Sequence, residues 1–190
     1  MKTILRILIG VCGLVVIVFG VKQFMKGVHE ISGKPAVQSQ KVGETFTSKE
    51  HGYSLRVPQG WEHKPPPPST ADMMASPKES GITSNMVTTI EPFPGSLSEY
   101  VDVTRASLER STPSATVVSE SEFLPTRGSA GHKMKLHNKY QDIDLAQTLY
   151  FFSGAGDNKI IVNCTTPAKF EAQLEPLFDD CLRTFAVTTQ

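Results

Sequence analysis

The segment Gly128–His132 is the one place where the sequence sets a possible nucleophile close to a base. A serine becomes nucleophilic when a histidine takes its proton, and many hydrolases hold that serine on a Gly-x-Ser-x-Gly turn between a strand and a helix. A glycine follows Ser129 by two positions, but none precedes it by two, and a strand is predicted to follow. The segment therefore indicates a hairpin turn or bulge, and Ser129 with His132 is the only pair on which a hydrolase could be built.

The remaining histidines do not form a metal-binding pattern. His132 and His137 are five residues apart, so on one strand they point to opposite faces and cannot share a metal ion. His51 and His63 flank another predicted strand and could approach each other, but the sequence offers no third ligand. We therefore predict no metal-binding, cofactor-binding or catalytic residue.

Two acidic pairs and two cysteines complete the candidates. The acidic pairs are interpreted as solvated surfaces rather than catalytic carboxylates. If the last helix folds back along the last strand, Cys181 lies about 21 Å along the helix and Cys164 about 7–10 Å back along the strand. That offset exceeds the roughly 7 Å beyond which a disulfide fails. We expect two buried free thiols, with a disulfide as the alternative that an exported domain would permit. The acidic pairs are Asp142 with Asp144 and Asp179 with Asp180.

The elements that must hold these groups are organised around one short strand. Tyr53, Leu55 and Val57 alternate with polar residues, which is typical of a half-buried strand. Pro58 ends the strand because proline cannot donate to a sheet ladder. Trp61, the only tryptophan of the chain, then returns to the core after a turn. We interpret Trp61 as a core anchor, and a ligand-stacking role is the alternative.

Two helices and further strands are predicted from the same kind of pattern. Ser96 and Glu99 have the Ser-x-x-Glu spacing of a capping box and begin a helix that ends before Pro113. The strongest helical stripe begins after Pro167, which suits a first turn, and Pro176 within it predicts a kink. Antiparallel strands interrupted by helices in this order predict an α+β domain, an antiparallel sheet covered by helices. The predicted strands beyond the first are residues 72–76, 84–90, 116–124, 129–140, 143–152 and 159–165.

The charges of the chain are unevenly placed, although they sum to zero. Residues 1–26 contain four basic residues and no acidic residue. The remainder carries 15 basic and 19 acidic residues, hence a net charge of about −4. Such a domain lacks the basic surface with which proteins bind nucleic acid. We therefore expect no nucleic-acid partner.

An apolar run, Ile7–Val21, lies between Arg6 and Lys22. As a helix it spans about 22 Å, less than the roughly 30 Å of a hydrocarbon core. Apolar neighbours lengthen it, and the flanking cations can reach the headgroups. Residues 4–25 are therefore predicted to lie in the lipid bilayer. A cleaved signal peptide is the main alternative, and Cys12 also allows a lipoprotein, although the residue before it is too large for that signal.

The membrane orientation is read from the basic residues on either side of this run. The short basic start is typical of a signal anchor that exports the following domain, whereas the lysines after the run favour retention inside. We expect an extracytoplasmic domain on a bacterial inner membrane. The chain then divides into an anchor or signal segment (1–26), a linker (27–44) and a folded domain (45–188).

Three features together resemble the PsbP-like and DcrB-like families. They are the strand and turn Gly52–Trp61, the helix after Pro94–Leu97 and the final helix with Arg183–Phe185 at its end. The resemblance covers about residues 45–188 and implies an α+β sandwich, preceded here by an N-terminal transmembrane helix rather than a lipoprotein signal. It also implies protein binding without catalysis, as in photosystem accessory proteins, envelope lipoproteins, nuclear-transport cofactors and chaperones for secreted effectors. No functional residue carries over.

Three functions follow as hypotheses. The first, which we favour, is a membrane-anchored, extracytoplasmic, non-catalytic protein-binding or accessory module whose protein partner the sequence does not identify. The second is a cytosol-facing chaperone-like domain that shields apolar helices of a client protein in an apolar groove. The third is a hydrolase, whose only candidate groups are Ser129 and His132.

Overall fold

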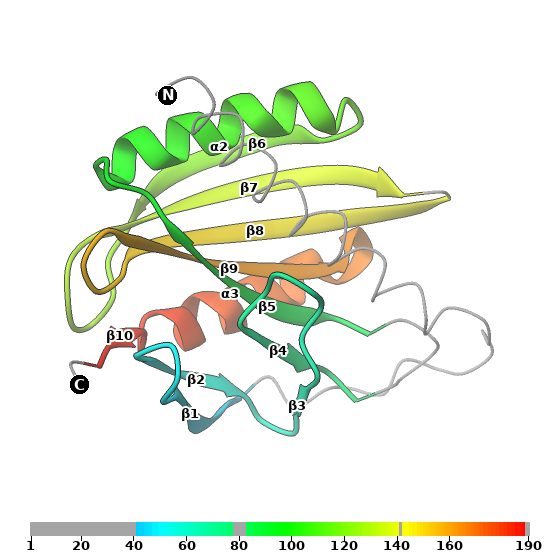
Figure 1. Cartoon of the computed structure of the whole chain (residues 1–190). Helices are drawn as coiled ribbons and strands as arrows, with labels where there is room; N and C mark the ends of the chain where they lie inside the picture. The colour runs from blue at the N-terminus through cyan, green and yellow to red at the C-terminus, as the bar shows by residue number, and fades with distance from the viewer. Residues whose placement is uncertain (1–40, 78–82, 141, 189–190) are drawn as a thin grey trace.

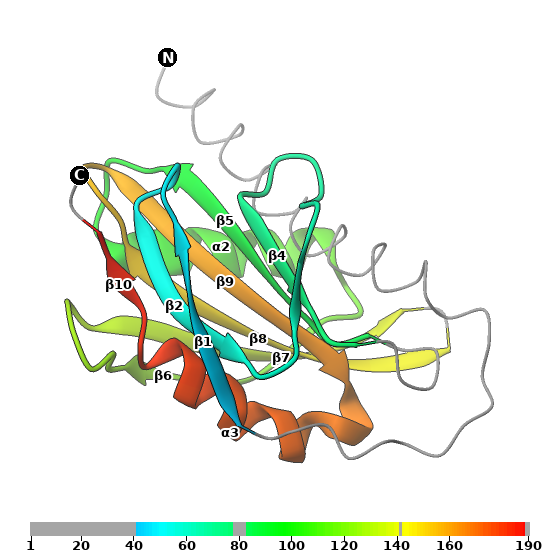
Figure 2. The same cartoon turned by 90° about the horizontal axis from the view of Figure 1, so that it is seen from below.

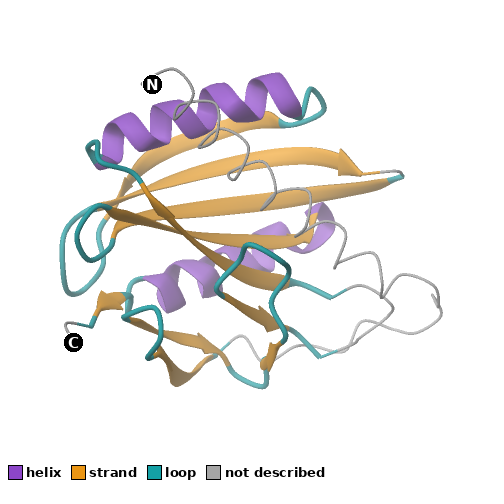
Figure 3. Ribbon diagram, in the orientation of Figure 1, coloured by secondary structure: helices purple, strands orange, loops and turns teal. Residues whose placement is uncertain are grey.

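In the computed structural model, the described residues are 41–77, 83–140 and 142–188. They form two antiparallel sheets and two α-helices (Figure 3). The α+β class predicted from the sequence is confirmed. The elements are β1 (Val42–Ser48), β2 (Tyr53–Pro58), β3 (Glu62–Lys64), β4 (Asp72–Ala75), β5 (Asn85–Pro92), α2 (Leu97–Ser111), β6 (Thr116–Phe123), β7 (Gly131–Tyr140), β8 (Ile143–Ser153), β9 (Asn158–Pro167), the 3₁₀ turn η1 (Ala168–Phe170), α3 (Glu171–Leu182) and β10 (Ala186–Val187).

The larger sheet has seven strands in the order β3-β4-β5-β9-β8-β7-β6. Strands β6 to β9 are joined in sequence as antiparallel neighbours. β5 pairs with β9. From β5 the chain continues through α2 to β6, which is the edge strand farthest from β3 (Figure 1). The smaller sheet has the order β1-β2-β10. It lies with α3 on one face of the larger sheet, while α2 lies on the other (Figures 1 and 2).

Each face of the larger sheet has its own apolar core, because successive strand residues point to opposite sides. Trp61 lies in the core on the α3 side, 8% exposed, and its ring meets Phe178 edge to face at 5.8 Å. The core-anchor interpretation of Trp61 is therefore confirmed. The cluster on the α3 side includes Tyr53, Leu55, Met74, Met86, Phe123, Tyr150, Phe152, Val162, Leu174, Leu177, Phe178 and Leu182. The cluster on the α2 side includes Tyr100, Val101, Leu108, Met134, Leu136, Leu149, Phe151 and Ile161.

Helix α2 begins as the sequence predicts. The Ser96 hydroxyl accepts a hydrogen bond from the Glu99 backbone N–H, and the Glu99 carboxylate accepts one from the Ser96 backbone N–H at 2.8 Å. This reciprocal pair satisfies two backbone donors that a helix start would otherwise leave open. The buried residues of α2 recur at helical spacing and face β7 and β8.

The start of α3 differs from the prediction. Pro167 belongs to β9, where it pairs with Leu145, and the α-helix begins only at Glu171 after η1. Proline suits the last position of a strand as well as the first turn of a helix, since neither position needs its missing N–H. Pro176 lies inside α3, which is one helix. Strands β3 and β10 were not predicted, because both are too short to show a period.

The N-terminal predictions concern a part of the chain that the structure leaves undescribed. The segment 1–26 lies outside the described residues, and so does the linker as far as residue 40. β1 begins at Val42, within the range 27–44 assigned to the linker. Within residues 41–77, 83–140 and 142–188, no helix has the length and apolar character needed to cross a membrane.

Candidate functional site

Gly128, Ser129 and Ala130 lie in the hairpin connection from β6 to β7, as expected, and His132 lies in β7. Gly131 begins β7 at a close approach, since a Cβ there would lie 2.5 Å from the carbonyl oxygen of Phe151. Ser129 is exposed, and within the described residues it has no hydrogen bond to His132. The imidazole Nε2 of His132 instead lies 2.9 Å from the Glu120 carboxylate. The two candidate hydrolase residues are therefore not arranged as a nucleophile and its base.

The Glu120 carboxylate is the centre of a cluster that joins α2 to the β6–β7 hairpin. Arg105 donates to both of its oxygens, at 2.6 and 2.7 Å, and donates a third bond to Asp102. The bonds from Arg105 hold the pKa of Glu120 below its ordinary value against the opposing effect of burial, and His132 adds to this. A carboxylate kept ionised by a bidentate guanidinium fixes geometry rather than transferring a proton. Sequence reasoning missed Arg105 and Glu120, because no local pattern links residues 15 apart.

An open groove of about 320 Å³ lies next to this cluster, between the first half of α2 and the β6–β7 hairpin. Its helix side presents Leu97, Val101 and Arg105. Its sheet side presents Glu122 and His132. The groove beside the first half of α2 is thus lined by both apolar and charged side chains.

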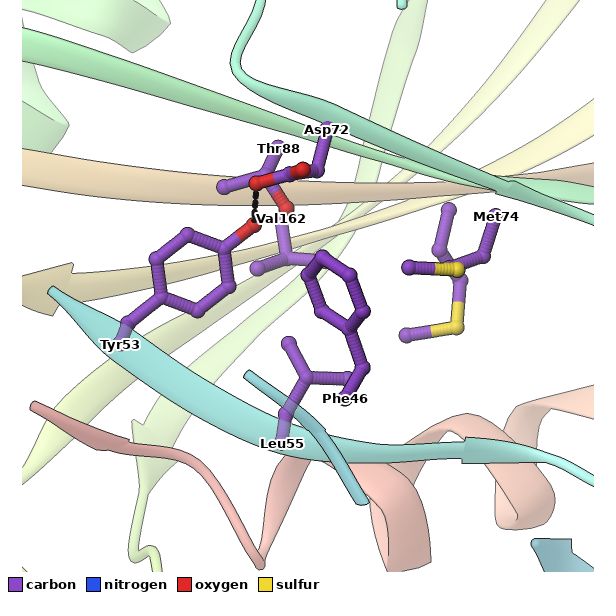
Figure 4. Close-up of a pocket in the computed structure, with 8 residues that line it drawn as sticks. Phe46, Tyr53, Leu55, Asp72, Met74, Thr88 and Val162 are labelled. Atoms are coloured by element: carbon purple, nitrogen blue, oxygen red, sulfur yellow. Dashed lines mark hydrogen bonds between the residues drawn. The ribbon is translucent and has the colours of Figure 1, made fainter. Parts of the chain in front are cut away.

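A second site lies where the smaller sheet meets β4 and β5 (Figure 4). The Tyr53 hydroxyl donates to Asp72 at 2.6 Å, and the His63 imidazole lies 3.2 Å from the other oxygen of Asp72. Burial, with the bond to Asp72, raises the pKa of Tyr53 well above its ordinary value, so the phenol stays protonated. The space enclosed is about 10 Å³, room for about one water molecule. This site joins two sheets and is too small for an organic ligand.

A ladder of ion pairs joins β7 to α3. On β7, Lys133, Lys135 and His137 repeat every second residue, about 6.7 Å apart; on α3, acidic residues repeat every fourth, about 6.0 Å apart. The spacings match, so successive cations meet successive acids. Lys133 binds Glu175 and Asp179, Lys135 binds Glu171 and Glu175, and His137 binds Glu171, with N–O distances of 2.7–2.9 Å. The i, i+4, i+8 spacing of the acids was the signal available in the sequence.

The ladder corrects the interpretation of one acidic pair. Asp179 is not a solvated surface group, because it also accepts a hydrogen bond from the Tyr150 hydroxyl at 2.7 Å. Asp180 beside it is exposed. Asp142, between β7 and β8, and Asp144, near the start of β8, are exposed as well. Among the residues that the structure describes, no three His, Cys, Asp or Glu side chains gather as a metal site.

The prediction of two free thiols is confirmed. Cys164 and Cys181 are both buried and unbridged, and both lie in the core on the α3 side. Burial raises the pKa of Cys181 to about 12 and that of Cys164 well above its ordinary value. Both groups are thus neutral thiols with little nucleophilic character at neutral pH.

Comparison with known proteins identifies the fold by shape. No protein-family model matches the chain, and no curated protein matches its sequence. Among solved structures, cyanobacterial PsbP (CyanoP) from Synechocystis sp. PCC 6803 superposes with a TM-score of 0.57 at 14% identity, over 84% of this chain and 98% of that one. The chain has the PsbP-like fold.

Two further structures share this PsbP-like fold. The Ran-binding protein Mog1p of Saccharomyces cerevisiae matches with a TM-score of 0.55 and 12% identity, over 77% of this chain and 96% of its own. LpqN of Mycobacterium tuberculosis, which is involved in cell envelope biogenesis, matches with a TM-score of 0.57 and 12% identity, over 89% and 97%. At these identities the likeness is one of fold.

Proposed function

We propose that the protein is a membrane-anchored, non-catalytic binding module whose PsbP-like domain lies on the extracytoplasmic side of a bacterial inner membrane. One observation carries the non-catalytic part: three of the candidate histidines pair with carboxylates on neighbouring elements, and none of them faces a nucleophile within the described residues. His132 pairs with Glu120, His63 with Asp72, and His137 with Glu171. A fold shared with a Ran-binding protein and an envelope protein supports the binding role.

The membrane anchor is proposed from the sequence. The apolar run Ile7–Val21 with its flanking cations supports insertion of residues 4–25 in the bilayer. The basic start before the run supports export of the domain. The partner is proposed to be another protein, because the net negative charge after residue 26 disfavours nucleic acid.

Protease accessibility in intact bacterial spheroplasts tests this proposal. The full chain carries a C-terminal tag, and protease is added before and after lysis, with one cytoplasmic and one periplasmic marker protein followed in the same sample. Digestion of the domain before lysis, with the tagged chain resisting alkaline extraction from the membrane, is the expected result. Protection until lysis would overturn the orientation and favour the cytosol-facing, client-shielding alternative. Release by alkaline extraction would overturn the anchor.

A further inference from the structure

Strand β6 forms an open edge of the larger sheet. It pairs with β7 on one side, and in the described residues none of its backbone groups bonds outside that ladder. It is eight residues long and contains no proline. The other edge strand, β3, has three residues and runs into Pro65–Pro68. Proteins commonly shorten or block an edge strand, because a free ladder recruits another chain; β3 is blocked in this way.

The side chains along β6 make this edge suited to a partner. Val118 is 49% exposed and Leu124, just after the strand, is 60% exposed. The register shift between Val117 and Ser119 removes Val118 from the regular ladder. The regular part, Ser119–Phe123, is therefore the length available for pairing, with an exposed apolar side chain at each end.

The net negative charge beside β6 favours a positively charged partner. Glu120 and Glu122 point to the α2 side, next to the groove, where Asp102 also lies with its side chain 63% exposed. These three carboxylates outnumber the one guanidinium, that of Arg105, so carboxylates and guanidinium together carry a net charge of −2. Arg105 is already engaged with Glu120, while Glu122 is exposed and has no ion pair within the described part of the chain.

We propose that β6 binds an extended, basic segment of a protein partner by strand addition, with alternate side chains of that segment entering the groove beside α2. Strand addition uses the free backbone ladder for affinity and the flanking groove for specificity. A lysine or arginine at every second position of the segment would face Glu122 and Asp102. This inference rests on the proposed binding function and names its surface.

Symmetric pairing of β6 with the same strand of a second copy is electrostatically disfavoured. A symmetric antiparallel pairing of Ser119–Phe123 with itself, centred on Ser121, sets Glu120 directly opposite Glu122 of the other copy. Like charges directly opposite each other destabilise a strand pair. The occupant is therefore a segment of opposite charge.

The experiment uses the full chain in detergent micelles and a synthetic peptide, Ac-Thr-Lys-Val-Lys-Val-Lys-Thr-NH2, with backbone amide exchange measured residue by residue. Amides of Ser119–Phe123 that face away from β7 are expected to slow by at least about tenfold when the peptide saturates. Amides that face β7 are already protected and stay unchanged. The same peptide with glutamate for lysine is expected to give no protection.

Two matched variants separate attraction of the peptide to the β6 edge from attraction to the net charge of the whole domain. Glu122→Lys is expected to weaken peptide binding at least about tenfold, whereas Asp180→Lys makes the same charge change on an exposed position of α3 and is expected to leave it unchanged. Absence of alternating protection in β6, or equal effects of the two variants, would overturn the inference. The spheroplast result is independent, so the proposed function could stand while this surface is wrong.

Discussion

The two faces of the seven-stranded sheet are built differently. On the α3 face, apolar and aromatic side chains fill the space up to the smaller sheet, and a ladder of ion pairs holds α3 to β7. On the α2 face, the apolar cluster lies under α2, mainly over β7 and β8, and buried polar residues lie beside it on β8, β9 and β5. These residues are Asn85, Thr89, Gln147, Asn163 and Thr165, each at most 2% exposed.

The polar residues of the α2 face are poorly satisfied. In the described part of the chain, both side-chain amide atoms of Asn85, the Thr89 hydroxyl, Oε1 of Gln147 and Nδ2 of Asn163 have no hydrogen-bond partner. A buried polar group without a partner costs about 1–3 kcal/mol. On the α2 face these groups therefore offset part of the stability that its apolar cluster supplies, whereas the α3 face combines apolar packing with paired charges.

The largest expected effect lies on the α3 face. Phe178 is 1% exposed and contacts Trp61, so Phe178→Ala leaves a cavity between α3 and the turn after β2. We expect the free energy of unfolding to fall by about 3–5 kcal/mol, measured by urea denaturation. Val187→Ala, at a 38% exposed position, is the control and should change it by less than about 0.5 kcal/mol. A loss below about 1 kcal/mol for Phe178→Ala would refute the assignment of stability to this face.

The second expected effect is on the ion-pair ladder. Glu175 accepts hydrogen bonds from both Lys133 and Lys135, and its side chain is 22% exposed. Glu175→Gln keeps the shape and removes the charge. We expect the free energy of unfolding at pH 7 to fall by about 1–2 kcal/mol. Asp180→Asn, an exposed acid on the same helix, is the matched control and should have little effect.

The ladder also predicts how stability depends on pH. Partial burial alone would raise the pKa values of Glu171 and Glu175, but hydrogen bonds from Lys135 and its neighbours on β7 outweigh it, so both lie below their ordinary values. A lowered carboxyl pKa stabilises the fold above the unfolded-state pKa, near 4.3, and this stabilisation is lost as pH falls through the folded-state pKa. We expect wild-type stability to fall below about pH 5, and Glu175→Gln to fall less steeply. Parallel curves would contradict this.

The sequence predicted those parts of the fold that depend on neighbouring residues. The alternation in β2, the capping box at Ser96 and the stripe of α3 are local patterns, and each was confirmed. The pairing of β5 with β9 is a contact between distant segments, and no period in either strand reveals it. The bond between Lys133 and Asp179 joins residues that are 46 apart in the sequence. It forms only because α3 packs against β7, which is likewise a contact between distant segments.

The proposed binding surface at β6 was likewise predicted only in its local part. The alternating residues of 116–124 predicted a strand, and β6 is that strand. Its position at a sheet edge depends on strand order, which the sequence did not reveal. The groove beside it depends on α2 crossing the sheet next to β6, and Arg105 and Glu120 meet only in the folded chain.

The smallest expected effect has the opposite sign and lies on the α2 face. Asn85 is 1% exposed and, within the described residues, neither of its side-chain amide atoms has a partner. Asn85→Leu replaces an unsatisfied amide by an apolar group of similar size next to Val87 and Ala75. We expect the free energy of unfolding to rise by about 1 kcal/mol. Thr45→Leu, on the partly exposed strand β1, is the control and should be nearly neutral. A loss of stability for Asn85→Leu would mean that ordered water satisfies this amide, and the contrast between the two faces would then be one of hydration.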